Sequence, residues 1–250
     1  MISLSLSDTT NRKKLEEKGN YTVYEYIQDM SVTPSNAIQS YYASQMNIRK
    51  RQVFIDLIDS EVIIQAGAMQ WMAGDVSATT NIKGAGDLIK KLASSKVTKE
   101  SAIKPKYQAK KGVLVLEPTY KHILIENVAD WGGMVIEDGL FLACDGTVNI
   151  KTIARTSLSS AIAGNEGLFN SCLFGNGYAV LESNVPRDEL IEVTLDNDVL
   201  KIDGNYAIAW SQSLNFTVER TTKSLIGSAA SGEGLVNVYR GTGKVLMAPL

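Results

Sequence analysis

The sequence ends in Glu233-Gly-Leu-Val-Asn-Val-Tyr-Arg-Gly-Thr-Gly-Lys-Val-Leu-Met-Ala-Pro-Leu250, and this stretch is one of three related copies. Residues 166–183 repeat its pattern, and residues 100–118 repeat it more loosely. In each copy a glutamate opens a short apolar segment, a glycine turns the chain, and a second apolar segment ends in a small polar residue or proline. The recurring positions are Glu100, Glu166 and Glu233 together with Gly112, Gly177 and Gly243. Their spacing of about 66 residues predicts three repeats with one shared structure.

Apolar segments before these copies recur with the same spacing. Predicted opening strands are residues 53–58, 123–126 and 190–195; second strands are 62–67, 134–139 and 199–204; third strands are 69–72, 140–144 and 206–210. We expect a polar turn between the opening and the second strand of each repeat. Asp138-Gly139 and Asp203-Gly204 predict two-residue hairpin turns, because these residue types tolerate positive φ.

Short strands with frequent turns predict an all-β fold, related to the double-stranded β-helix. We expect one compact body of three repeats, at residues 48–118, 119–183 and 184–250, packed around a pseudo-threefold axis. No linker separates the repeats, and each alone would be marginal in size. Connectors at residues 88–95, 158–165 and 225–232 fit either helical turns or loops.

Residues 1–47 precede the repeats and are expected to pack on the first one. Residues 13–18 could form a helical turn, and residues 21–27 alternate like a strand. Tyr41 and Tyr42 resume an apolar stretch. We expect the whole segment to form one or two strands that cover the first repeat, with a binding surface formed by its tyrosines as the alternative.

Composition and charge exclude several classes of protein. The chain of 250 residues is 44% hydrophobic and 21% charged, with a net charge of -2. This balance gives no general reason to expect nucleic acid or an anionic membrane as partner. No apolar run approaches the roughly 20 residues of a membrane span, and the first residues do not resemble a secretion or transit signal. With Cys144 and Cys172 expected as buried thiols, we predict a cytoplasmic protein.

The repeated motifs resemble a known family. They are Gly67-Ala-Met-Gln-Trp-Met-Ala-Gly74, Asp138-Gly-Leu-Phe-Leu-Ala143, Asn165-Glu-Gly-Leu-Phe169 and the stretch from Gly232 to Leu246. In order and spacing they resemble the altered-inheritance-of-mitochondria (mitochondrial biogenesis) family over about residues 48–250.

The resemblance implies a fold like that of the trp RNA-binding attenuation protein, with three β-sandwich-like subdomains around a pseudo-threefold axis. Bacterial members largely lack an assigned function, and eukaryotic members are linked to mitochondrial inner-membrane organisation. The family supplies no catalytic residues to transfer. The chain departs from its pattern at Lys110-Lys111-Gly112, where a Gly-x-Gly turn is usual, and at Gly84-Ala-Gly86, where the glycine-rich stretch is shorter.

Sequence motifs for catalysis are missing. His122 is the single histidine, so a histidine-based metal site cannot be assembled, and we expect His122 to be a surface or core residue. No Gly-x-Ser-x-Gly elbow and no phosphate-binding loop occurs, and Gly241-Thr-Gly243-Lys244 is expected to close a hairpin. We therefore expect no cofactor and no catalytic residue.

Two charged groups could still form sites. The glutamates Glu100, Glu166 and Glu233 could line a shared cleft as carboxylate catalysts, but their repetition favours a structural role at equivalent corners. Between Lys83 and Lys121 ten lysines face three acidic residues, and the weak binding candidates are Lys90, Lys91, Lys104, Lys106, Lys110 and Lys111. A solvated face explains these lysines better than nucleic acid, since arginines are missing and only Tyr107 and Tyr120 supply aromatic rings nearby.

The sequence thus predicts a cytoplasmic, non-enzymatic scaffold or interaction module, with an unknown protein partner or self-association. The alternative is a module that binds a small molecule or RNA, at the axis between repeats or at the lysine-rich face of the first repeat.

Overall fold

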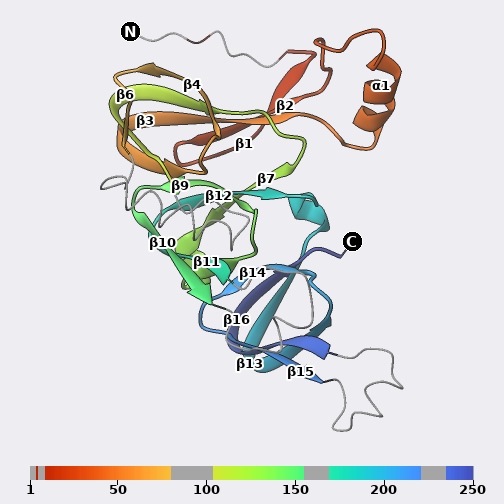
Figure 1. Ribbon diagram of the computed structural model, residues 1–250, viewed down its shortest axis with the longest axis vertical. Coiled ribbons are helices and arrows are strands. Elements are labelled where there is room, and N and C mark those ends of the chain that lie inside the picture. The colour runs from red at the N-terminus through yellow and green to blue at the C-terminus, as the bar shows by residue number, and fades with distance from the viewer. Residues whose placement is uncertain (1–3, 5–8, 80–103, 155–168, 221–234, 250) are drawn as a thin grey trace, which may run out of the picture.

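The computed structural model describes residue 4 and residues 9–79, 104–154, 169–220 and 235–249. These residues form sixteen strands, one α-helix and two short 3-10 helices (Figure 1). The all-β prediction is confirmed. None of the helices in these ranges is long and apolar enough to span a membrane.

The first repeat follows an N-terminal extension. The extension contains β1 (Arg12–Lys18), β2 (Tyr21–Tyr26) and α1 (Ala37–Gln45), and the repeat contains β3 (Arg51–Ile64), β4 (Met69–Gly74), β5 (Ser77–Thr79) and β6 (Lys106–Leu116). The long strands β3 and β6 pair from end to end, and β2 pairs with the other side of β3. β1 pairs with β2, so the extension continues the sheet of the first repeat.

The other two repeats use the same order of segments. The second contains β7 (His122–Asn127), η1 (Val128–Trp131), β8 (Met134–Ile136), β9 (Phe141–Asp145), β10 (Val148–Ala154), β11 (Phe169–Gly175) and β12 (Tyr178–Ser183). The third contains η2 (Arg187–Glu189), β13 (Ile191–Asp203), β14 (Ala207–Ser211), β15 (Asn215–Arg220) and β16 (Leu235–Met247). In all three repeats the third strand pairs with the closing strand through a β-bulge at the same place.

Neighbouring repeats are joined by strand pairing. The end of β3 pairs with β9, which places Ile63 opposite Cys144. In the same way β8 pairs with β14, which places Val135 opposite Trp210. These two junctions produce one nine-stranded sheet and one seven-stranded sheet, each shared by two repeats.

The hydrophobic core is also shared between repeats. The cluster inside the first repeat includes Ile125 and Val180 from the second. The cluster inside the second repeat includes Ile63 from the first and Leu246 from the third. Each repeat therefore completes the core of its neighbour, which explains why no linker separates them.

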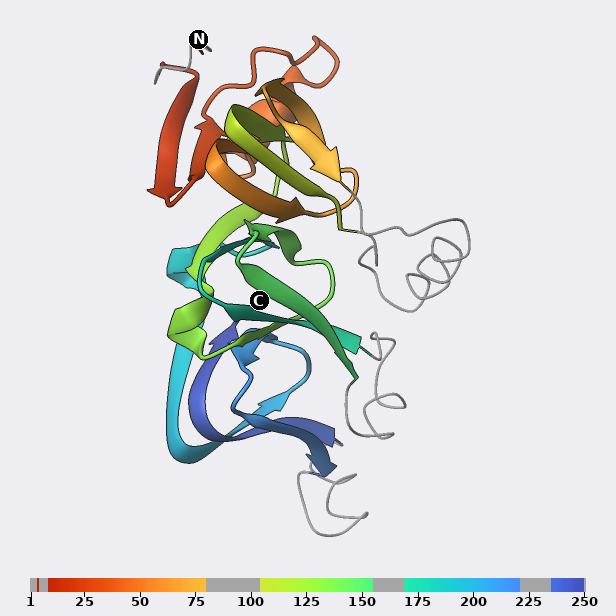
Figure 2. The same ribbon diagram turned by 90° about the vertical axis from the view of Figure 1, so that its left-hand side faces the viewer.

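The predicted pseudo-threefold closure is not confirmed. Figure 2 shows the three repeats one above another, with the first at one end and the third at the other. Among the described strands, pairing joins the first repeat to the second and the second to the third, and none joins the third to the first.

The predicted turns between opening and second strands differ from the structure. In the first and third repeats the two strands are one long strand, bent at Asp59 (φ 45°) and Asn197 (φ 50°). Asp and Asn tolerate this left-handed conformation, so one residue bends the strand where we expected a turn. Only the second repeat has a true break, where Asn127 accepts a hydrogen bond from the amide of Ala129 to start η1.

The Asp-Gly turns form without the predicted hairpins. Gly139 and Gly204 have φ of 85° and 82°, as expected for a turn. The strands on either side do not pair with each other: β8 and β9 belong to different sheets, and β16 separates β13 from β14. The turn at Gly139 therefore carries the chain from one sheet to the other, and the turn at Gly204 carries it past β16 within one sheet.

Two predictions for the extension were wrong. Residues 13–18 form a strand, because they pair with β2 on both sides of an irregularity between Lys14 and Glu16. The segment around Tyr41 and Tyr42 is a helix, not a strand, and both side chains are exposed.

Candidate functional site

The lysine-rich face is partly neutralised where it is described. Lys104 donates to Gln65 Oε1 and lies 4.1 Å from the ring centroid of Phe141. Lys106 forms a 2.7 Å ion pair with Glu61. Lys110 and Lys111 are exposed on β6, and Lys90 and Lys91 lie outside the described residues.

The repeated glycines mark a close crossing of strands. Gly112 and Gly243 lie inside the continuous strands β6 and β16, so they are not the predicted turn residues, whereas Gly177 lies between β11 and β12. At each site the third strand of the same repeat crosses the closing strand. An added Cβ would lie 2.9 Å from Ala73 O at Gly112, 2.8 Å from Asp145 Oδ2 at Gly177 and 2.7 Å from Ser211 Cβ at Gly243. The glycines permit this approach.

The carboxylate hypothesis cannot be followed further in the structure. Glu100, Glu166 and Glu233 lie outside the described residues, as do the connectors at 88–95, 158–165 and 225–232. Within the described ranges, no group of three or more His, Cys, Asp or Glu could hold a metal ion. Both cysteines are buried and free, and burial raises the pKa of each thiol.

A buried ion pair ties the extension to the repeats. Arg51 on β3 and Glu25 on β2 are opposite each other in the sheet, are 2% and 3% exposed, and form a 2.7 Å ion pair. Arg51 also donates to the carbonyl oxygens of Asn47 and Tyr120. Burying a charge pair carries a desolvation penalty unless further hydrogen bonds compensate it. Here the hydrogen bonds of Arg51 connect the start of the first repeat to the start of the second.

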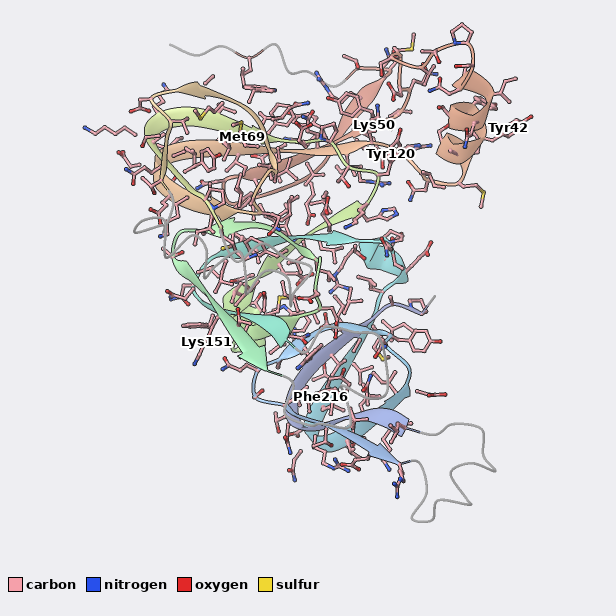
Figure 3. The ribbon with its side chains drawn as sticks, in the orientation of Figure 1. Tyr42, Lys50, Met69, Tyr120, Lys151 and Phe216 are labelled. Atoms are coloured by element: carbon pink, nitrogen blue, oxygen red, sulfur yellow. The ribbon has the colours of Figure 1, made fainter. Side chains whose placement is uncertain are left out.

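Helix α1 carries the largest group of exposed apolar side chains in the described residues. None of its nine residues is buried. Ile38, Tyr42 and the following Met46 are 73%, 67% and 76% exposed, and their i, i+4, i+8 spacing places them in one row. Figure 3 labels Tyr42 on α1, with Lys50 and Tyr120 on neighbouring segments of the body. We call Ile38, Tyr42 and Met46 the outer row.

The opposite side of α1 borders a cavity of about 540 Å³. The cavity separates α1 from the ends of β2 and β3, and its lining includes Tyr26, Met30, Tyr41, Ile48 and Tyr120. Lys50 lies 5.9 Å from the ring centroid of Tyr120 and pairs with Asp29 at 2.7 Å. The sequence suggested a binding surface at Tyr42 only as an alternative, and it indicated neither Ile38 and Met46 nor this cavity. The i, i+4, i+8 spacing was the available signal for the outer row, whereas the cavity depends on tertiary structure.

Comparisons with known proteins agree with the fold. The chain is similar to the crystal structure of protein SPYM3_0169 from Streptococcus pyogenes, with a TM-score of 0.59 and 26% identity, covering 82% of this chain and 90% of the other. It is 28% identical over 195 residues to the uncharacterized protein M6_Spy0233 of Streptococcus pyogenes serotype M6, covering 76% of this chain and 77% of that protein. A model of the mitochondrial biogenesis AIM24 family matches residues 45–250, and the chain therefore belongs to this family.

Proposed function

We propose that the protein is a non-enzymatic interaction module of the cytoplasm that binds another protein through the outer row of α1. The observation that carries this proposal is a helix with no buried residue and a row of three large apolar side chains facing solvent. An isolated helix of nine residues is marginal in water, so contacts outside the helix are expected to stabilise it. Exposed apolar patches on otherwise ordinary surfaces mark interaction sites.

The geometry fits a helix that lies in a groove of its partner. Such contacts use apolar side chains along one face of a helix, typically at i, i+3, i+4 and i+7. Ile38, Tyr42 and Met46 likewise lie along one side of α1. Tyrosine supplies a large contact area with few rotatable bonds and is enriched at binding hot spots. The body of the protein would then serve as a rigid support that presents α1.

Site-specific photo-crosslinking in the native host tests the proposal. A photoreactive residue at Tyr42 should crosslink to one protein, and Ile38→Glu should abolish that adduct. The matched control is a photoreactive residue at Tyr206, which is 47% exposed and lies in the third repeat. No protein adduct at position 42, or the same adducts at positions 42 and 206, would overturn the proposal.

Binding of a small molecule in the cavity beside α1 is the second candidate function. A volume of about 540 Å³ lies within the range of about 300–1,000 Å³ seen for ligand pockets, and tyrosines and aliphatic side chains line it. Native mass spectrometry of gently purified protein should detect a retained small molecule. The variant Ala37→Phe, which fills the cavity from α1, should lose it, and a bare chain in both samples would exclude this candidate.

A further inference from the structure

A second cavity combines an excess of positive charge with segments from all three repeats. Its volume is about 280 Å³, and it is lined by Lys13, Leu15, Glu25, Asn47, Arg49, Arg51, His122, Ile123, Pro186 and Arg187. The extension contributes β1 and β2, and the first repeat contributes the start of β3. The second repeat contributes the start of β7, and the third contributes η2. We call it the junction pocket.

Three cations share one carboxylate in this pocket. Glu25 lies 2.7 Å from Arg51, 3.2 Å from Arg49 and 3.9 Å from Lys13. A single carboxylate balances only one of these charges, so the group keeps a surplus of positive charge. Arg187 does not add to the surplus, because Glu126 and Glu192 pair with it at 3.2 Å and 2.8 Å.

The cations differ in how many of their hydrogen-bond donors are already used. Arg51 donates to backbone and side-chain oxygens on several segments and has a structural role. Arg49 uses Nε on Ser44 O and Nη1 on Glu25, and its Nη2 has no partner among the described residues. Lys13 contacts Glu25 only at 3.9 Å. Arg49 and Lys13 therefore retain donors for a ligand.

The side chain of His122 has no hydrogen-bond partner in the described part of the chain. Burial lowers its pKa, and the charge of Arg51 lowers it further, while Glu25 and Asp188 act in the opposite direction. The ring lies in the pocket together with Lys13, Arg49 and Arg187. An anion bound here would relieve the repulsion between Lys13, Arg49 and Arg51 and would favour the protonated form of the His122 ring.

We propose that the junction pocket binds a small oxyanion, a phosphate or carboxylate group, which accepts hydrogen bonds from Lys13, Arg49 and protonated His122. Charge-assisted hydrogen bonds from guanidinium and ammonium groups are the usual means of recognising such groups. Its volume of about 280 Å³ is close to the lower end of the range of about 300–1,000 Å³ seen for ligand pockets. Because the walls come from all three repeats, the bound anion would hold their starting segments together.

The single histidine makes the test direct, since the proton NMR spectrum contains one histidine ring. Inorganic phosphate and succinate are titrated separately between about pH 5 and 8, at constant ionic strength set with chloride. We expect a saturable shift of the His122 resonance and a raised pKa of His122. A response to phosphate alone would identify a phosphoryl ligand, and a response to both would identify a general oxyanion site.

Paired variants connect the response to the pocket. Lys13→Gln should weaken binding by roughly threefold to fivefold, and Arg49→Gln by about tenfold or more. Lys14→Gln is the matched control, because Lys14 neighbours Lys13 but pairs with Glu17 and does not line the pocket. Lys13 is half exposed, so its variant retains the fold even if Arg49→Gln does not. No saturable shift in the wild-type protein, or equal binding by Lys13→Gln and Lys14→Gln, would overturn the proposal.

Discussion

The junctions between repeats and the two ends of the stack are built from equivalent positions that carry different residues. Ala68, Leu140 and Tyr206 are equivalent, since each carbonyl accepts the same hydrogen bond from its closing strand. Five residues earlier stand Ile63, Val135 and Lys201, and three residues later stand Trp71, Ala143 and Ala209. Ile63 and Val135 are buried against the next repeat, and Ala143 and Ala209 are buried against the previous one.

At the ends, these positions are occupied by residues that do not suit a further junction. Lys201 is exposed on the free side of the third repeat, and a lysine on a strand edge discourages further pairing. Trp71 packs edge-on against Phe54, 6.0 Å between centroids, and covers the first repeat's outer cluster. The difference teaches that a repeat array needs terminal residues that end it as well as internal residues that join it.

The largest expected effect comes from placing an end residue inside a junction. Val135→Lys buries an unpaired ammonium group at a position that is 2% exposed, and it should lower the free energy of unfolding by about 3 kcal/mol or more. Urea denaturation measures the loss. The reverse change, Lys201→Val, is the control and should stay within about 0.5 kcal/mol of wild type. Equal effects of the two variants would contradict the comparison.

A smaller effect is expected from exchanging the aromatic end residue with an internal alanine. Ala209→Trp overpacks a fully buried position and should cost about 1–3 kcal/mol. Trp71→Ala should cost about 1 kcal/mol, because a half-buried ring loses its contact with Phe54. Thermal and urea unfolding of both variants measure whether Ala209→Trp loses more stability than Trp71→Ala. A greater loss of stability for Trp71→Ala would refute this prediction.

Removing both end residues together should change association more than stability. Trp71→Ala combined with Lys201→Val gives both end faces the character of internal faces, so copies are expected to join head to tail. Light scattering coupled to gel filtration should detect a higher mass than for wild type at the same concentration. Each single variant should have the same mass in solution as wild type. An unchanged mass for the double variant would show that other features end the stack.

The smallest expected effect concerns the charge pair beside α1. Hydrogen bonds from Lys50 and Ser31 lower the pKa of Asp29 to about 2. A carboxyl with a depressed folded pKa stabilises the fold above its unfolded pKa, and this stabilisation is lost as pH falls from about 4 towards 2. Lys50→Gln should return the pKa of Asp29 towards its usual value, measured by carboxyl NMR titration. An unchanged pKa of Asp29 in that variant would show that Lys50 is not the cause.

Sequence patterns predicted the parts of this structure that depend on local chemistry. The spacing of the glycines predicted three repeats, and alternating apolar residues such as those of β2 predicted strands. The bends at Asp59 and Asn197 were misread as turns, because a single left-handed residue looks the same in sequence as a loop. The tyrosines of α1 have high strand propensity, yet this segment forms a helix, so propensity alone was not sufficient.

The two candidate sites also differ in how far the sequence alone predicts them. The outer row follows from i, i+4, i+8 spacing and can be found once a helix is assumed. The junction pocket cannot be found in this way, since Lys13, Glu25, Arg49, His122 and Arg187 come from separate segments of the chain. Their convergence depends on the pairing of β1 with β2 and on the packing of three repeats.

The pairing of β3 with β9 has a consequence for synthesis on the ribosome. Residues 62–64 pair with residues 143–145, so the partner of this apolar edge lies about 80 residues downstream. At about 5–20 residues per second, this edge waits about 4–16 s from its own emergence until its partner strand has been made. Unlike the edge at Lys201, it has no charged residue at the equivalent position to prevent pairing with another nascent chain. We therefore expect the protein to be most prone to aggregation while the first repeat is complete and the second is still being made.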